Sequence, residues 1–344
     1  ELKKIIDNFF DKNGFPKNRN SEHLILFLQY FIIIKEWIKN AQETVPEFLS
    51  EIIEKNLTCL NSLKNESDNL PLFNGATEKN LKDFFLYLEK LNYSFQKKIK
   101  IVGQIQVLKA KKNFLYFDAG EPPVNTYSKD YQSGPLSFEY FNDASKIITN
   151  CGYGRRISKK TKLISKFTSA QSTLCLNDTS VVKFQKSNLI NKAYGLPISD
   201  TFKTFDVIRN ETKTEYFLSA THNAYLSKYG YLHKREIRVL KKDGTIIGSD
   251  TLVKKKEFSG SINFSIRFHI YPGINVVKTV SGKSILLQIN KNKSWILLSD
   301  SHSLEIEAGL FMGRKKVLNN SCVVIYGNTN SNDTNIKWEL KKSV

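Results

Sequence analysis

The sequence is poor in the residue types that bind metals or form structural disulfides. Its 344 residues include only four cysteines and five histidines. The cysteines form no CxxC or Cys/His pattern, which argues against a zinc knuckle. Three of them lie within apolar runs, where a buried thiol is the simplest interpretation, although the spacing also allows pairing, so the redox compartment stays open. The cysteines are Cys59, Cys151, Cys175 and Cys322.

A long hydrophobic run is also missing. The best candidate, Leu24–Ile38, is short and is interrupted by Gln29, Lys35 and Glu36. It therefore predicts a buried helix and no transmembrane segment. The chain starts at Glu1, within a helical pattern and without a methionine or a signal peptide, which predicts that a further segment precedes it.

Acidic residues are scarce relative to basic ones. There are 33 aspartates and glutamates against 52 lysines and arginines, and the formal net charge is +19. Such a charge favours polyanionic partners through long-range attraction and counterion release. The excess is mostly lysine and is spread along the whole chain, so the codon bias of an AT-rich genome explains it equally well. No recognition helix, zinc finger or RNA-binding motif accompanies the charge, and we expect no nucleic acid partner.

The first part of the chain has a helical pattern. Between Glu1 and about Ser94, apolar residues recur at the spacing of an amphipathic helix. Turn and cap signals separate the predicted helices at Asn13-Gly14, at Asn20-Ser21 and at Pro46. These apolar stripes indicate helix packing and carry no chemistry.

After Tyr93 the pattern changes to short strands. Strand-like runs separated by Gly, Pro, Asn and Asp turns, without a helical period between them, predict one large antiparallel sandwich. We therefore predict a multidomain α+β fold, in which a helical segment is followed by a large antiparallel β-sandwich. The runs are Lys98–Leu108, Phe114–Phe117, Leu136–Tyr140, Lys146–Thr149, Ser172–Asn177, Thr214–Leu218, Glu236–Leu240, Ser261–His269, Ser284–Ile289, Ser294–Leu298, Ser303–Ile306, Cys322–Tyr326 and Ile336–Leu340.

The stretch Asn113–Phe184 carries the most conspicuous polar loops. Its strand-like runs surround the turn at Asn142-Asp143 and have the pattern of a β-meander. The loops between them contain more Gly, Pro, Asn, Gln and Tyr than hairpins need. Because binding groups are usually carried on such loops, we expect the functional site here.

Several strings, in this order and spacing, resemble the heparinase II/III-like C-terminal domain. In addition, Leu70–Gly75 resembles the last part of the helical toroid that precedes this sandwich in the family. The resemblance covers essentially the whole chain. It implies the end of an α/α toroid over residues 1–95 and a heparinase II/III-like sandwich over residues 96–344. The strings are Gln104–Pro123, Gly134–Glu139, Ile148–Gly152, Ser169–Thr179, His222–Arg238, Ile266–Tyr271 and Trp338–Leu340.

The resemblance implies a polysaccharide lyase that acts on acidic, uronate-containing glycans. In the β-elimination that such lyases perform, a cation or hydrogen-bond donor neutralises the uronate carboxylate, and a Tyr or His base removes the C5 proton. An acid then protonates the departing O4, and no water is consumed. The family also implies an acidic polysaccharide or oligosaccharide partner. It suggests a location in the periplasm or cell envelope, with the cytoplasm still open.

The chain departs from the family where relatives have a His/Asp/His set that can hold zinc. These positions are Gln132, Asn150 and Gln171, and the family's His-rich stretch also includes the position of Asp130. Because amides are weak neutral ligands for zinc, we predict no metal and no cofactor. In a lyase, the three carboxamides would instead donate hydrogen bonds to the uronate.

A second family motif, Gly-Gly-His-x-x-Arg-Asn, aligns with residues 14–20. Its histidine is lost, but Arg19 and Asn20 are retained, and we predict that both bind substrate. Arg155 is a further candidate, since a guanidinium can clamp a carboxylate bidentately, although a solvated turn is the simpler explanation and ranks ahead.

His222 and Tyr225 are the principal catalytic candidates. Within residues 222–225 a potential base, a carboxamide and a phenol occur together, and the alternative is a structural hydrogen bond. Tyr131 and Tyr153, near the replaced positions, are further candidate bases. His23 lies at the start of an apolar helix, which indicates packing.

Two functions from different classes fit these observations. In the first, the protein is a lyase whose base and carboxylate neutraliser are Tyr, Arg and amide side chains. In the second, it is a non-catalytic glycan-binding or envelope-polysaccharide handling protein on the same scaffold. The lost histidines favour the second function, and the retained Arg19 and Asn20 favour the first, which we rank ahead.

Overall fold

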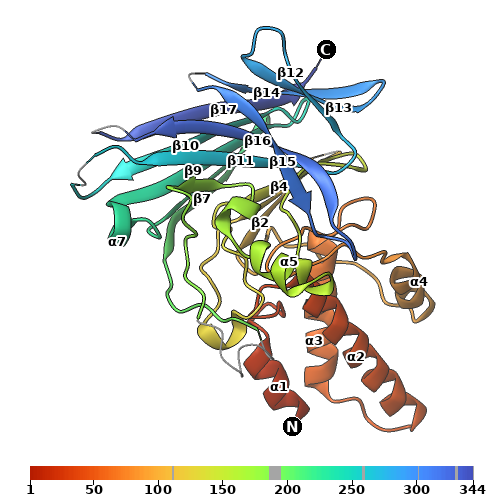
Figure 1. Cartoon of the computed structure of the whole chain (residues 1–344). Helices are drawn as coiled ribbons and strands as arrows, with labels where there is room; N and C mark the ends of the chain where they lie inside the picture. Colours follow the sequence, from red (N-terminus) through yellow and green to blue (C-terminus); the bar gives the residue numbers. More distant parts are fainter. Residues whose placement is uncertain (111, 186–194, 258–259, 301, 330–331, 344) are drawn as a thin grey trace.

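Four helices form in the N-terminal part, where the apolar spacing predicts them. The structure, a computed structural model, describes residues 1–110, 112–185, 195–257, 260–300, 302–329 and 332–343. Figure 1 shows the helices gathered at one end of two large sheets. The helices are α1 (Leu2–Phe9), α2 (Ser21–Asn40), α3 (Glu47–Leu63) and α4 (Lys82–Lys90).

The first sheet contains the meander and most of the polar loops. It has nine strands in the order β1-β2-β3-β4-β5-β11-β16-β15, with β6 paired to β11, and the pairs are antiparallel. β4 and β5 form the predicted hairpin around Asn142-Asp143. The strands are β1 (Ile101–Val102), β2 (Ile105–Ala110), β3 (Asn113–Asp118), β4 (Phe138–Asn142), β5 (Ser145–Thr149), β6 (Leu174–Leu176), β11 (Asn263–Ile270), β15 (Leu304–Phe311) and β16 (Leu318–Asn328).

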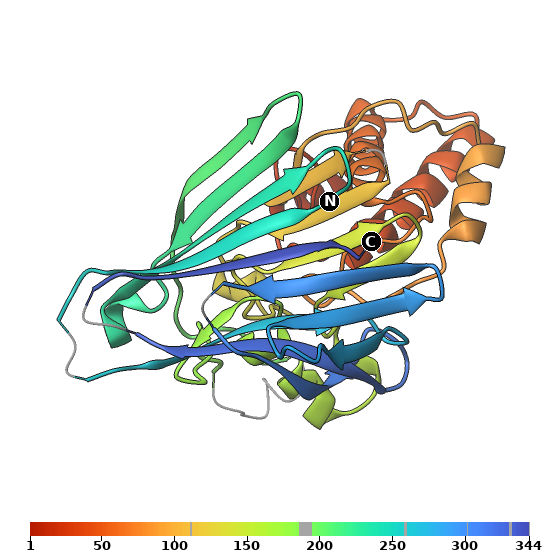
Figure 2. The same cartoon turned by 90° about the horizontal axis from the view of Figure 1, so that it is seen from above.

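The second sheet has eight antiparallel strands in the order β12-β13-β14-β17-β10-β9-β8-β7. Figure 2 shows the β7–β8 hairpin projecting from the edge of the body. The sequence pattern did not predict β7, β10 or β12. The strands are β7 (Thr204–Glu211), β8 (Glu215–His222), β9 (Tyr231–Leu240), β10 (Ile246–Lys254), β12 (Asn275–Lys278), β13 (Ser284–Asn290), β14 (Lys293–Ser299) and β17 (Thr334–Lys342).

The main core lies between the two sheets. Phe138 of β4 stacks on Trp338 of β17, with ring centroids 5.6 Å apart and an interplanar angle of 6°. Gly248 of β10 lies against the same indole, and a Cβ there would be 2.1 Å from the ring. This packing of one antiparallel sheet on another confirms the predicted fold class.

The helices share a second core with the first sheet. In β3, Phe114 and Tyr116 pack with the helices, whereas Leu115 and Phe117 face the core between the sheets. This alternation follows from the two-residue period of a strand and leaves both faces of β3 covered. The division at residues 95 and 96, and the assignment of the helices to a toroid, stay predictions. Among the described residues no helix is both long enough and apolar enough to cross a membrane.

Candidate functional site

A row of buried polar side chains crosses β8, β9 and β10. The Ala224 amide donates to Nδ1 of His222 at 3.2 Å, so Nε2 carries the proton of this neutral ring. His222 Nε2 donates to His233 Nδ1 at 3.0 Å, and His233 Nε2 donates to Asp250 Oδ1 at 2.7 Å. Arg235 binds both oxygens of Asp250, at 2.7 and 3.0 Å. We call His222, His233, Asp250 and Arg235 the buried row; their side chains are 0% exposed.

The buried row holds both of its imidazoles neutral. Burial lowers the pKa of His222 well below its usual range, and His233 and Arg235 lower it further. Burial also lowers the pKa of His233, and the hydrogen bond to Asp250 opposes this effect. Because both nitrogens of His222 already have partners within the chain, these contacts argue for a structural role. Its predicted role as a catalytic base stays untested.

Tyr225, like His222, is buried and bonded to another part of the chain. Its side chain is 2% exposed and its hydroxyl donates to the Leu174 carbonyl at 3.1 Å. Burial raises the pKa of the phenol well above its usual range. A phenol held in this way stabilises the fold, and its predicted catalytic role also stays untested.

Two of the three predicted carboxamides meet at one carbonyl. Gln132 Nε2 and Gln171 Nε2 donate to the Ser165 carbonyl at 2.7 and 2.9 Å. Gln132 Oε1 accepts from the Gly75 amide at 3.0 Å, which ties the segment before α4 to the sandwich. The residues are 3% and 2% exposed. Their polar atoms therefore brace loops of the chain, and binding of substrate by them stays a prediction.

Asn150 occupies the third of these positions and is fully buried. Its Oδ1 accepts from the Ser172 amide at 2.9 Å, while its Nδ2 has no partner in the described structure. Across the described ranges, no group of three or more His, Cys, Asp or Glu side chains could hold a metal ion.

We expect chelators to have no effect on this protein. EDTA should change neither the melting temperature nor any turnover, because the side chains at these positions are neutral amides already bonded to the chain. Thermal unfolding followed by circular dichroism with and without EDTA measures this, and calcium-saturated EDTA controls for ionic strength. A lower melting temperature with EDTA alone would show that a metal contributes to the fold.

Arg19 and Asn20, both predicted to bind substrate, lie at the junction of the helices and the sandwich. Arg19 forms an ion pair with Asp118, and its Nε donates to the Gly103 carbonyl at 2.9 Å. Asn20 caps α2, because its Oδ1 accepts from the Glu22 amide at 2.8 Å. Both side chains are buried and serve the fold through these contacts, so substrate binding by them stays a prediction.

A more accessible polar group lies where the start of α2 meets the sandwich loops. Tyr153 donates its hydroxyl proton to Asp130 Oδ1 at 2.6 Å, and Arg155 Nη1 lies 3.7 Å from Asp130 Oδ2. The side chains of Arg155 and Asp130 are 61% and 16% exposed, whereas Tyr153 is buried. We call Asn18, His23, Asp130, Tyr153 and Arg155 the interface cluster.

His23 is the histidine of this cluster, and its tautomer is set by Asn18. Asn18 Oδ1 accepts from the Asn20 amide at 3.1 Å, so its Nδ2 must be the group that donates to His23 Nδ1. Neutral His23 therefore carries its proton on Nε2. Burial lowers the pKa of His23, with Asp130 opposing this effect, so the ring offers a neutral N–H donor at neutral pH.

Charged side chains around Glu22 hold the helices against these loops. Glu22 pairs with Arg156 at 2.5 Å and with Lys79 at 3.0 Å, and it also accepts from the Thr77 hydroxyl at 2.8 Å. An open groove of about 640 Å³ begins beside Lys79 and continues to Arg314. The interface cluster and this groove therefore border the same salt-bridged junction.

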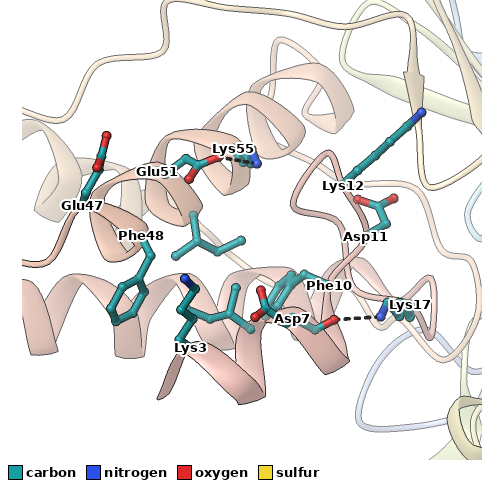
Figure 3. A pocket seen from close by; sticks show the side chains of 12 residues that line it. Lys3, Asp7, Phe10, Asp11, Lys12, Lys17, Glu47, Phe48, Glu51 and Lys55 are labelled. Atoms are coloured by element: carbon teal, nitrogen blue, oxygen red, sulfur yellow. Dashed lines mark hydrogen bonds and ion pairs between the residues drawn. The ribbon is translucent and has the colours of Figure 1, made fainter. Parts of the chain in front are cut away.

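Another hollow, of about 680 Å³, lies between α1 and α3 (Figure 3). It suits an acidic ligand poorly, because its four basic side chains face four acidic ones, and Lys55 pairs with Glu51 at 2.6 Å. The charged residues are Lys3, Lys12, Lys17, Lys55, Asp7, Asp11, Glu47 and Glu51.

The sequence interpretation did not propose His23 or Asp130 for a site. His23 follows the cap of an apolar helix, a position that usually indicates packing, and in the sequence Asp130 is only a departure from the family pattern. Their proximity depends on how α2 docks on the sandwich, which no local pattern encodes. The signal that was available was Tyr153-Gly-Arg155, two polar candidates separated by a single residue.

Comparison with known proteins identifies related sequences and folds. The Heparinase II/III-like, C-terminal family matches residues 101–339. A heparan sulfate lyase, HepC from Pedobacter heparinus, superposes with a TM-score of 0.79 at 13% identity, over 99% of this chain and 55% of that one. A heparinase III structure gives a TM-score of 0.70 at 12% identity, over 99% and 56% of the two chains. At such identities the likeness shows the fold alone.

One curated relative is also similar in sequence. FtsZ-localized protein C from Caulobacter vibrioides is 25% identical over 196 residues, which are 55% of this chain and 33% of that protein. The chain thus spans about half the length of the solved lyases and a third of this relative.

Proposed function

The chain belongs to the Heparinase II/III-like, C-terminal family, and from this membership we propose that it is a polysaccharide lyase acting on acidic, uronate-containing glycans at the interface cluster. The observation that carries the proposal is the grouping of a partly exposed carboxylate, an exposed guanidinium and a neutral imidazole N–H donor where the start of α2 meets the sandwich loops. Glycosaminoglycans are the substrate class that the family suggests. We also propose a location in the periplasm or cell envelope, which cell fractionation can test.

Four residues of the cluster take part in the proposed elimination. The Arg155 guanidinium and the His23 Nε2–H would bind the uronate carboxylate, which makes the C5 proton more acidic. Asp130 would accept that proton, since a positioned carboxylate can act as base towards a carbon acid. Tyr153 is the positioning residue, because its hydroxyl fixes Asp130 Oδ1 at 2.6 Å. Burial and the neighbouring Asp130 raise the pKa of this phenol, which keeps it a donor.

With these groups, every bond, electron pair and proton of the elimination is accounted for. The C5–H bond breaks and its proton moves to Asp130, while the electron pair forms the C4–C5 double bond. The C4–O4 bond breaks as that double bond forms. The proton on Asp130 then passes to O4 of the departing sugar, so the carboxylate is regenerated and no water is consumed.

Absorbance of the unsaturated uronate ends tests this proposal. The protein is incubated with a panel of acidic polysaccharides, and the ultraviolet absorbance of the product is followed. An increase with at least one uronate polymer is expected. A polymer that binds in a separate titration but gives no absorbance with any preparation would rule out the lyase function.

Variants of the cluster locate the chemistry. Asp130→Asn should lower kcat by about 10²- to 10⁴-fold, because the proton acceptor is lost while the size of the side chain is kept. Asp143→Asn is the matched control, since it lies in the β4–β5 turn at a φ of 55° that asparagine tolerates. A normal kcat for Asp130→Asn would remove the proposed base.

A pair of tyrosine variants shows whether the elimination takes place at the interface cluster or beside His222. Tyr153→Phe should lower kcat by about tenfold, because Asp130 loses its positioning donor. Tyr225→Phe should affect stability more than turnover, because its hydroxyl bonds only to the chain. If instead Tyr225→Phe abolished turnover in a folded protein that still binds substrate, the chemistry would lie beside His222.

A second function is favoured by a specific set of observations. The positions of the family's His/Asp/His set are buried carboxamides here, and the curated relative is named for its localisation with FtsZ. A non-catalytic protein that binds or handles envelope polysaccharide would keep the scaffold without the chemistry. Saturable binding without any absorbance change would support this alternative.

A further inference from the structure

Two strongly basic segments converge beside the interface cluster. The first contains Arg155, Arg156 and the short helix α5 (Lys159–Ile164), and no Asp or Glu occurs between residues 144 and 177. The second is the turn between β15 and β16, which contains residues 314–316, and no Asp or Glu occurs between residues 308 and 332. Neither segment therefore contains an acidic residue of its own.

A backbone contact holds the two segments together. The Met312 amide donates to the Cys151 carbonyl at 2.5 Å, and a Cβ on Gly152 would lie 2.3 Å from Cα of Gly313. Gly152 also has a φ of +72°, so any other residue would be strained there. Figures 1 and 2 both show the β15–β16 turn next to α5. The arrangement is thus built into the fold, although the segments are far apart in the sequence.

The charges of this surface are only partly compensated. Arg155, Arg156 and Arg314 form ion pairs with Asp130, Glu22 and Glu78. The lysines of the two segments have no ion pair within the described ranges, and four of the five are exposed. We call these lysines the basic face: Lys159, Lys160, Lys162, Lys315 and Lys316.

The position of α5 is fixed by its own cap. Ser158 Oγ accepts from the Thr161 amide at 3.1 Å, and Thr161 Oγ1 accepts from the Ser158 amide at 2.9 Å. Thr161 Oγ1 also donates to the Gly154 carbonyl at 2.9 Å, one residue before Arg155. Lys159 and Lys160 therefore extend from a backbone that is joined directly to the interface cluster.

We propose that the basic face binds the anionic groups of the same polysaccharide chain whose uronate enters the interface cluster. This inference rests on the proposed function and specifies its substrate: a polymer with carboxylates or sulfates on several successive sugars. Several exposed lysines without ion pairs attract such a chain through their summed field. Nucleic acid is less well suited, since residues 155–164 and 312–317, which carry these lysines, include no aromatic side chain on which bases could stack. A membrane is less well suited because α5, with six residues, is too short for an interfacial amphipathic helix.

Binding of long and short ligands separates the basic face from the interface cluster. A fourfold variant, with Gln at Lys159, Lys160, Lys315 and Lys316, should bind a long sulfated or carboxylated polymer about tenfold more weakly at low salt. The difference should shrink near 1 M salt, where the Debye length is about 3 Å. Affinity and KM for an acidic disaccharide should be unchanged, because it occupies only the interface cluster.

Matched variants and other polyanions make this test decisive. Lys159→Gln with Lys160→Gln is compared with Lys255→Gln and Lys256→Gln, an equally exposed lysine pair in another part of the chain. Equal losses in the two double variants, or polymer binding unaffected by the fourfold variant, would overturn the proposal. Loss of affinity for DNA or for anionic vesicles but not for the glycan would overturn it as well. Because binding is measured without turnover, the result stands even if no lyase activity is found. A comparison of sulfated with unsulfated polymers shows whether the basic face binds sulfates or carboxylates.

Discussion

Replacement of Asp250 by alanine is expected to cost about 3–5 kcal/mol of folding free energy. The carboxylate is 0% exposed and neutralises Arg235, which is equally buried, through two contacts at 2.7 and 3.0 Å. It also accepts from Trp338 Nε1 at 2.9 Å and from His233 Nε2 at 2.7 Å. The variant leaves a buried cation and two buried donors without their acceptor. Since small proteins have only about 5–15 kcal/mol of stability, much of it should be lost. Urea unfolding followed by tryptophan fluorescence measures this loss.

Two further variants show whether burial is the cause. Glu305→Ala removes the partner of Lys278 in an ion pair whose side chains are 48% and 38% exposed, and should cost only about 0–1 kcal/mol. Replacing Arg235 by Met together with Asp250 by Leu should recover part of the loss, because no buried charge is left unpaired, while His233 and Trp338 still lack their acceptor. If Asp250→Ala cost no more than Glu305→Ala, the buried pair would contribute little to the fold.

The folded protein is also expected to lose stability steeply as the pH falls below about 6.5, the usual pKa of histidine. Burial lowers the pKa values of His222 and His233, and it lowers the pKa of His269 to about 4. Below pH 6.5 the unfolded chain binds protons on these rings and the folded chain does not, so the free energy of unfolding decreases. These three rings alone give a slope that approaches about 4 kcal/mol per pH unit well below pH 6.5, and the contribution of His269 ends near pH 4.

Urea midpoints between pH 5 and pH 8 measure this dependence. His269→Gln should reduce the slope by about one proton, or about 1.4 kcal/mol per pH unit, because one of the three neutral rings is gone. His302→Gln should change the slope much less, since that ring is only partly buried, whereas His269 is 5% exposed. A stability that stays constant from pH 7 to pH 5 would mean that the buried imidazoles accept protons in the folded state.

The sequence predicts the regular parts of this fold better than the parts in which polar residues lie inside strands. The β4–β5 hairpin follows from apolar alternation around Asn142-Asp143. β10 was missed because its inward-facing positions include Gly248 and Asp250, which strands usually exclude. Only tertiary partners explain them, since Trp338 occupies the space of a Gly248 side chain and Arg235 compensates the charge of Asp250. β7 was missed because it is an edge strand with exposed residues on both faces, such as Val207 and Ile208.

The candidate site shows the same limit. The sequence places Tyr153 and Arg155 near each other, but does not place His23, which α2 brings to them from more than a hundred residues away. The carboxamides Gln132 and Gln171 do come together, as their common place in the family's metal set suggests. That their donors are used by the Ser165 carbonyl depends on loop geometry, which composition and spacing do not encode.

The two-sided burial of β3 has a practical consequence. A truncated protein that contained the sandwich without the helices would expose Phe114 and Tyr116 as part of an apolar surface on the first sheet. We expect this truncated protein to precipitate during expression or to self-associate through that apolar surface. Because the helices cover this face of the first sheet, a recombinant form of the sandwich should include them.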